Sequence, residues 1–335
     1  MTPPPTISNP SRPRPTFLAN GGRDLSQWLS DAIYNGLSSL PEQPQPFWDG
    51  IVNRMVDADA PGVARLLRRL QPLTKSGEGW PDRVLDQLGR LHLLAESLLR
   101  YEDLPETLQG DIQAVLGYAP HLDECVLQVA DSWVVLGRYA NNGGAFNDVP
   151  TVRMWLYGKY SRRFACQSVT GPLPTGRPLS PDEGPDHPFA IRGNFAAAFG
   201  LWADAELTFG PSAYPLRAVV RQVCEGPYNM ATPSELQIGY VSISAALEGY
   251  AEALSANPFL EQFPVALQNV IPTKQGNTYL LCDDFTEALP IWPGFANVWS
   301  LFALSGGEPI SVFGEWEGQF FLPLSVWHKE AFIAV

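Results

Sequence analysis

The sequence predicts an α+β protein, with a helical N-terminal region of paired helices followed by a mainly antiparallel β region with a few helices. In the first third of the chain, apolar residues recur every three or four positions, as they do on one face of a helix. Further along, runs of β-branched and aromatic residues alternate with glycine and proline, which is typical of short strands. We expect a flexible Pro-rich leader at 1–23, a helical region at 24–130 and an α+β region at 131–335.

Six helices are expected in the helical region. The fourth has the clearest apolar stripe, with steps that alternate between four and three residues. Its members are Val84, Leu88, Leu91, Ala95 and Leu98. Asp24 is expected to cap the first helix and Asp59 the third, because their carboxylates can accept from free backbone N–H groups. The others are expected around 47–55, 108–116 and 122–129.

The α+β region is expected to combine strands with one clear helix. Thr232 and Glu235, in the sequence TPSE, form a capping box that predicts a helix with its body at 241–254, before the stop signal Asn257-Pro258. The last expected strands, joined by glycine-containing turns, form a meander. The expected strands span 132–140, 152–169, 195–202, 205–209, 278–282, 298–304, 310–316 and 319–324.

The charge of the chain argues against nucleic acid as the partner of this chain alone. The formal net charge is -13 and the pI is about 4.7, so a phosphate-binding surface would have to work against the overall field. The small basic clusters are interpreted as solvated faces. They are Arg65, Arg68 and Arg69 on a helix, and Arg162 with Arg163 in a strand-like region.

The cysteines and the terminal segments favour a reduced, cytoplasmic protein. The four cysteines are far apart, with no C-x-x-C pair and no histidine at a zinc-like spacing, so we expect neither a metal nor a cofactor. The N-terminus lacks the apolar core of a secretory signal, and no apolar run is long enough to span a membrane.

No catalytic motif is found, so the chain is not expected to be an enzyme. The sequence contains neither a phosphate-binding loop nor a Gly-x-Ser-x-Gly elbow. Glu315 and Glu317 flank Trp316 and could form an acid/base pair, but solvated carboxylates at a hairpin tip are the favoured interpretation. His187 could meet a nucleophile only through tertiary contacts, which leaves an unrecognised hydrolase as an alternative.

The segment Leu207–Val220, LTFGPSAYPLRAVV, is expected to leave one sheet and enter a new element, because neither of its prolines can donate to a strand ladder. Ser212 is then a local cap or turn hydroxyl. An aromatic ring beside a guanidinium is a common pair at interaction surfaces. The candidate interaction surface comprises Tyr214, Arg217, Glu315 and Trp316.

Four dispersed segments carry a resemblance to a known family. They are LSQWLSDAIYNGLSSLPEQPQPFWDGIVNRMVDADAPGVARLLRRL, DAELTFGPSAYPLRAVV, LEGYAEALSANPFLEQFP and LFALSGGEPISVFGEWEGQFFLPLSVW. In this order they resemble the C-terminal region of bacterial SWIM zinc-finger family proteins, from about residue 24 to Trp327. Family members carry an N-terminal Cys-x-Cys…Cys-x-His finger, but this chain has neither pair. The zinc site is therefore carried over to no residue.

The resemblance implies a partner and no defined chemistry. Genes of this family are often grouped with those for a MoxR-type AAA+ ATPase and a von Willebrand factor A-type protein. We therefore expect a non-enzymatic protein-interaction module with one of these as its partner. One alternative is a nucleic-acid-binding adaptor whose zinc finger is supplied by another chain. The hydrolase is the second alternative, and the oligomeric state is left open.

Overall fold

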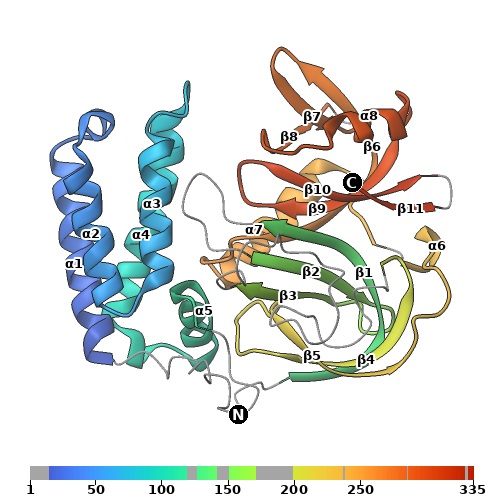
Figure 1. The fold of residues 1–335 in the computed structure, drawn as a ribbon, viewed down its shortest axis with the longest axis horizontal. Helices are drawn as coiled ribbons and strands as arrows, with labels where there is room; N and C mark the ends of the chain where they lie inside the picture. The colour runs from blue at the N-terminus through green and yellow to red at the C-terminus, as the bar shows by residue number, and fades with distance from the viewer. Residues whose placement is uncertain are drawn as a thin grey trace, which may run out of the picture. The chain divides into compact units, whose positions relative to one another are not determined.

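The computed structural model describes residues 15–118, 127–141, 151–170, 199–236, 238–284, 286–328 and 331–335. Contacts divide these residues into two units. The helical unit contains the described residues up to Tyr118 together with Pro211–Ala213, and the β unit contains the rest. A bundle of helices precedes antiparallel sheets, so the predicted α+β class is confirmed (Figure 1).

The helical unit pairs its long helices, as predicted. α1 packs against α4, and α2 packs against α3 (Figure 1). The elements are α1 (Pro15–Tyr34), the 3-10 helix η1 (Leu37–Glu42), α2 (Gln45–Asp57), α3 (Pro61–Leu73), α4 (Trp80–Leu99), the 3-10 helix η2 (Tyr101–Asp103) and α5 (Glu106–Leu116). Every residue of the predicted α4 stripe is buried, which confirms that this face packs into the core.

Aromatic rings and a close backbone approach fix how the helices meet. Trp28 of α1 packs against Phe47 and Trp48 of α2, with ring centroids 5.3 and 5.9 Å away. At the other contact, a Cβ atom on Gly62 of α3 would lie 1.7 Å from the carbonyl oxygen of Val115 in α5. Only glycine allows these two backbones to approach so closely.

The first and last predicted boundaries of the helical region differ from the structure. α1 begins at Pro15, so Asp24 lies inside a helix and residues 15–23 of the expected leader are helical. Asp59 has a φ of 57° and Ala60 stands at the N-cap of α3 without a side-chain bond, so the predicted Asp59 cap is wrong. In the expected helix at 122–129, residues 127–129 belong to a strand, and the others lie outside the described residues.

The first sheet of the β unit has five antiparallel strands in the order β3-β2-β1-β4-β5. The strands are β1 (Leu127–Asn141), β2 (Thr151–Gly158), β3 (Phe164–Thr170), β4 (Trp202–Phe209) and β5 (Ala218–Glu225). The sheet curls until its edge strands meet: the N–H of Cys166, in β3, donates to the carbonyl of Leu216, just before β5, at 2.6 Å. The expected strand at 152–169 is thus two strands with a turn between them.

Small residues on one face of this sheet make room for large ones. Its cluster includes Ala165, Ala203, Ala205 and Ala218, beside the rings of Trp133 and Phe209, whose centroids are 6.3 Å apart. Alternation of small and large side chains is how the interior of a strongly curved sheet is filled. The opposite face contributes Val134, Leu136 and Trp155 to a second core that is shared with the other sheet.

The second sheet has six strands in the order β11-β10-β9-β6-β7-β8. The strands are β6 (Phe263–Gln275), β7 (Thr278–Cys282), β8 (Ala288–Pro290), β9 (Ile310–Trp316), β10 (Phe321–His328) and β11 (Ala331–Ala334); the helices of the unit are α6 (Pro233–Leu236), α7 (Ile243–Ala256) and α8 (Val298–Ser305). Both edge strands are short, with three and four residues, which limits the open edge available for aggregation.

The expected strand at 298–304 is wrong, because these residues form α8. A short, continuously apolar run has no period that separates a strand from a buried helix. Gly306 ends the helix in the left-handed region, with a φ of 56°, and its N–H donates to the carbonyl of Phe302. In contrast, the predicted capping box is confirmed: the N–H of Thr232 donates to Glu235 at 3.1 Å, and the N–H of Glu235 donates to Thr232 at 3.4 Å. The helix that it begins is the short α6, however, and the helix predicted at 241–254 is the separate α7, which Ser242 caps.

A buried ion pair joins the two sheets. The guanidinium of Arg153, in β2, donates to both carboxylate oxygens of Glu315, in β9, at 2.8 and 2.6 Å. The indole N–H of Trp155 donates to the same carboxylate at 2.7 Å, and the ring of Tyr139 lies 4.3 Å from the guanidinium carbon. Nearby, the hydroxyl of Ser325 donates to the carbonyl of Leu136 at 2.5 Å.

The charge state of this pair is set by the balance between burial and attraction. Burial alone would lower the pKa of Arg153, but the charge of Glu315 and its hydrogen bonds raise this pKa by more. Arg153 therefore stays protonated. A buried ion pair is weak evidence of net stabilisation, but loss of one partner leaves an uncompensated charge in the core.

We predict that Glu315→Gln lowers the free energy of unfolding by about 3–5 kcal/mol, because Arg153 then stays buried without its countercharge. Urea unfolding followed by tryptophan fluorescence measures the change. The control is Glu308→Gln, an exposed carboxylate, for which a change within about 0.5 kcal/mol is expected. Equal stabilities for Glu315→Gln and the wild-type protein would contradict this account of the pair.

Candidate interaction site

The four residues of the expected interaction surface all lie in the β unit, but only two of them remain accessible. Glu315 and Trp316 are 3% and 6% exposed, so neither contributes to an exposed patch. Glu315 is the buried partner of Arg153 rather than a solvated hairpin carboxylate. Tyr214 is half-buried against Phe263, with centroids 6.3 Å apart, and Arg217 is exposed. An interaction role stays a prediction for Tyr214 and Arg217.

Ser212 was expected to be a turn hydroxyl, and the structure gives it a specific partner. Within the helical unit, its hydroxyl donates to one carboxylate oxygen of Asp111 at 2.5 Å. The N–H of Ala213 donates to the other oxygen at 2.9 Å. Burial raises the pKa of Asp111, and these two hydrogen bonds oppose the rise. The carboxylate therefore organises the tripeptide Pro211–Ala213.

Cys166 lies beside the buried ion pair, but its thiol has the properties of an unreactive one. Burial raises the pKa of its thiol to about 12; the charge of Glu315 adds to the rise, and Arg153 and Arg217 oppose it. Because the thiolate is the nucleophilic form, such a thiol is unreactive at neutral pH.

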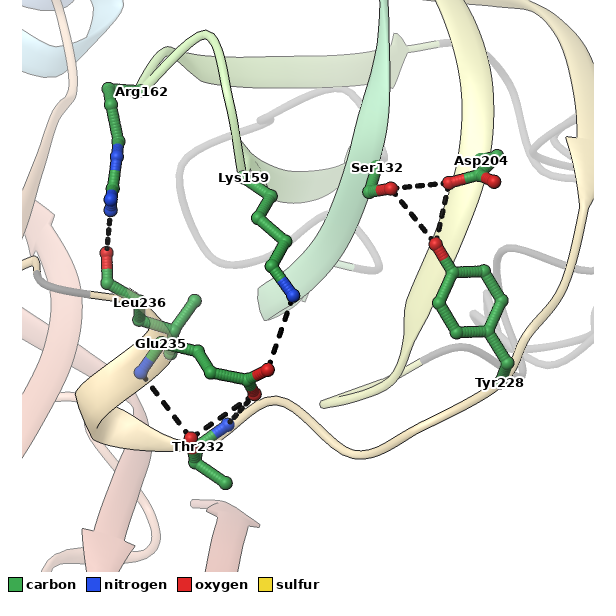
Figure 2. Close-up of polar contacts among 8 residues, drawn as sticks. All are labelled: Ser132, Lys159, Arg162, Asp204, Tyr228, Thr232, Glu235 and Leu236. Carbon is green, nitrogen blue, oxygen red and sulfur yellow. Dashed lines mark hydrogen bonds and ion pairs between the residues drawn. The ribbon is translucent and has the colours of Figure 1, made fainter.

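A second polar cluster, which the sequence did not indicate, lies on β1, β4 and the segment after β5 (Figure 2). The hydroxyls of Ser132 and Tyr228 both donate to one carboxylate oxygen of Asp204, the Tyr228 bond being 2.6 Å long. The two hydroxyl oxygens are 2.9 Å apart. Burial is the largest cause of the raised pKa of Tyr228, followed by the bond to Asp204. Tyr228 therefore stays protonated and remains fastened to the sheet.

The turn between β2 and β3, residues 159–163, lies beside this cluster. Asp131 of β1, which is buried, accepts from the backbone N–H groups of Tyr160 at 3.1 Å and Ser161 at 2.7 Å. Arg162 has a φ of 56°, in the left-handed region that disfavours side chains, and its guanidinium donates to the carbonyl of Leu236 at 2.8 Å (Figure 2). Tertiary contacts thus hold the turn in a conformation that is unfavourable by itself.

Lys159, at the start of the turn, points to the capping box. Its ammonium forms an ion pair with Glu235 at 3.2 Å (Figure 2). The same ammonium lies 4.9 Å from the ring centroid of Trp202. Hydrogen bonds from Thr232 and Lys159 lower the pKa of Glu235. The ion pair is partly exposed, so its main effect is to orient the lysine rather than to stabilise the fold.

Three large exposed residues belong to the turn at 159–163 and to the segment after β5. Tyr160 is 77% exposed, and Met230 and Tyr228 are also exposed. We call Tyr160, Tyr228 and Met230 the tyrosine surface. Its sequence signal is the run GKYSRR, in which a tyrosine is surrounded by charged and small residues. This run did not indicate an exposed site in the sequence, because the strand predicted over 152–169 places the tyrosine inside a strand rather than in a turn.

The bonds of the Ser132 hydroxyl bear on whether this serine could act as a nucleophile. A serine nucleophile needs a neighbouring base that can accept its proton. Within the described part of the chain, the Ser132 hydroxyl bonds to the carboxylate of Asp204 and the hydroxyl of Tyr228, whereas the backbone N–H of Lys159 donates to the Ser132 carbonyl. Two of the four histidines, His121 and His187, lie outside the described residues, so the role considered for His187 stays a prediction. Among the described residues, no group of three His, Cys, Asp or Glu side chains could hold a metal ion.

We predict that Cys166 resists alkylation by iodoacetamide at about pH 8, because its thiol is buried and its pKa is raised. Cys224 is exposed and is expected to react under the same conditions. Peptide mass spectrometry resolves the two sites, and unfolding in urea should make both reactive. Alkylation of folded Cys166 as fast as Cys224 would contradict the burial described above.

Comparisons with known proteins inform the helical unit alone. Residues 14–116 match the family model described as the SWIM-associated four-helix bundle domain. No curated protein matches the chain, and no solved structure matches it. No helix among the described residues combines the length and apolar character needed to cross a membrane. This match, which ends with α5, agrees with the resemblance to the C-terminal region of SWIM zinc-finger proteins.

Proposed function

We propose that this chain is a non-enzymatic protein-interaction module and that the tyrosine surface is a docking site for its protein partner. The single observation that carries the proposal is the combination of exposure and rigidity at Tyr160. Its side chain is 77% exposed, while its backbone N–H is held by Asp131. Because the backbone at Tyr160 is already held, less conformational entropy is lost when a partner covers this residue.

The surroundings of Tyr160 have the composition of an interface. Exposed tyrosine and methionine side chains lie beside charged residues such as Lys159 and Glu235. Interfaces are enriched in aromatic residues and methionine near their centre and in polar residues at their rim. Tyr228 adds a second ring, fixed by Asp204. These features support protein binding without requiring a catalytic group.

The resemblance to SWIM zinc-finger proteins supports an AAA+ ATPase of the MoxR type, or a von Willebrand factor A-type protein, as the partner. Both remain proposals by association with the family, because the site itself specifies no particular partner. The charge of the chain is relevant here: at -13, electrostatic attraction would favour a partner with a basic surface.

The adaptor that borrows a zinc finger from another chain is less well supported. The arginines that would have to form its basic surface lie in both units. Arg65, Arg68 and Arg69 are in α3, whereas Arg162 and Arg163 follow β2. Arg162 donates to the carbonyl of Leu236, which gives its side chain a structural use. The hydrolase alternative requires a nucleophile with an activating base, and the Ser132 hydroxyl bonds to the carboxylate of Asp204 rather than to a histidine or lysine.

The test begins with purification of the chain from its own cells and identification of any protein that copurifies in constant ratio. Calorimetry with the purified partner then compares the wild-type chain with Tyr160→Ala, for which we predict at least about tenfold weaker binding, the effect of losing an aromatic hot spot. Tyr34→Ala is the matched control, because Tyr34 is a 92% exposed tyrosine on α1, and it should bind unchanged.

Two outcomes would contradict the proposal. A chain that copurifies with no protein would favour an enzyme or a ligand-binding protein. A partner whose affinity is the same for the Tyr160→Ala and wild-type chains would show that the tyrosine surface is not the docking site. Circular dichroism establishes that each variant is folded before binding is measured.

A further inference from the structure

Three aromatic rings form a cluster at the surface of the β unit, on β7 and α8. The rings of Tyr279, Trp299 and Phe302 contact one another in pairs, with centroids 5.8 to 5.9 Å apart. Trp299 is 63% exposed, whereas Tyr279 and Phe302 are half-buried. Tryptophan is among the residues most enriched at the centre of protein interfaces. We call these three residues the ring cluster.

A hollow of about 500 Å³ adjoins the ring cluster along α8. Ala303 lines this hollow and, because it follows Trp299 by four residues, lies on the same side of the helix. The other walls include Ile310 and Trp327, which are buried, and Glu308, which is exposed. The rings and the hollow together suit an extended segment of several residues.

The hollow has a negative character. It lies at the C-terminal end of α8, where the carbonyls of Ala303 and Leu304 accept no backbone hydrogen bond among the described residues. Such carbonyls carry the negative end of the helix dipole. Of the described residues that line the hollow, only Glu308 is charged. At the rings, the ammonium of Lys274 lies 5.3 Å from the centroid of Tyr279. A cation is therefore favoured in the hollow and disfavoured beside the rings.

The chain contains a segment of matching chemistry at 1–14, MTPPPTISNPSRPR, outside the described residues. It is rich in proline, and its two charged side chains, Arg12 and Arg14, are both basic. Proline-rich segments bind surfaces lined with aromatic rings, because an extended backbone loses little entropy on binding. Residues two apart in such a segment are separated by about 6 Å. Trp299 and Ala303 are separated by about the same distance along the axis of α8.

We propose that residues 1–14 of one chain bind the ring cluster and the adjoining hollow of a second copy. Pro10 packs against the rings, and the guanidinium of Arg12 enters the hollow, where it meets Glu308 and the carbonyls at the end of α8. Every chain carries both the segment and the surface, so the contact is heterologous and can join more than two copies. This inference does not depend on the function proposed for the tyrosine surface.

Fluorescence anisotropy with a labelled peptide of residues 1–14 tests the binding. The full chain in this assay carries Arg12→Glu, so that its own segment does not compete. We expect a dissociation constant of roughly 10 to 100 µM, because a short segment covers less area than a standard interface. Added salt should weaken the binding, because opposite charges face each other. Peptides with Arg12→Glu and Arg14→Glu, or with Pro10→Ala and Pro13→Ala, should each bind at least tenfold more weakly.

Matched variants of the chain test the two parts of the surface. Trp299→Ala and Glu308→Lys should each weaken peptide binding at least tenfold, through the lost ring and the reversed charge. Their controls are Tyr34→Ala, an exposed ring on α1, and Glu287→Lys, an exposed carboxylate of the same unit, and both should bind unchanged. Tyr160→Ala should also bind unchanged, which separates this surface from the tyrosine surface. Circular dichroism checks each fold, and the substituted peptides test the same contacts without altering the chain.

Sedimentation equilibrium of the unsubstituted full chain tests whether a second copy supplies the segment. The average mass should rise between about 5 and 500 µM and fall when the peptide is added in excess. Arg12→Glu should remove the association. A peptide that does not bind, or that binds equally to the Trp299→Ala, Glu308→Lys and unsubstituted surfaces, would overturn the inference. Peptide binding by a chain that stays monomeric at every concentration would overturn the second copy as the source of the segment.

Discussion

The buried pair between Arg153 and Glu315 is the constraint on which the arrangement of the β unit depends. A charge in the core is tolerated only while the opposite charge lies beside it. Arg153 of β2 must therefore lie opposite Glu315 of β9, which fixes where these two strands lie relative to each other. Apolar contacts alone would permit a shift, because one aliphatic side chain replaces another at small cost. The first sheet also curls around its own cluster of alanines and large aromatic rings. The curl and the ion pair together fix where its strands end.

The position of the tyrosine surface follows from that placement. The turn at 159–163 begins where β2 ends, and Asp131, in the neighbouring strand β1, accepts two of its backbone N–H groups. Asp204, one strand further, holds Tyr228. The carboxylates of Asp131 and Asp204 therefore accept hydrogen bonds from elements at the margin of the sheet, where Tyr160 is exposed. Rigidity beneath an exposed ring is the property that an interaction module needs and that a loop on its own could not supply.

The helical unit uses glycine in two opposite ways. Gly62 is required by the interior, because the carbonyl of Val115 occupies the space that a Cβ atom would need. Gly89 faces outward, where the bundle gives no reason for it. A Cβ atom at Gly89 would meet no atom within 4 Å, so the bundle requires glycine at position 62 and does not require it at position 89.

The sequence by itself determined what depends on near neighbours in the chain. The stripe of α4 and the capping box at Thr232 were predictable because helical periodicity and capping involve residues three or four positions apart. The α+β class followed from the same local patterns. Only the tertiary structure decided the character of 298–304, the burial of Glu315 and Trp316, and the exposure of Tyr160. Glu315 meets Arg153 across 162 positions and Tyr160 meets Asp131 across 29, and a local pattern carries no information about partners so distant in the chain.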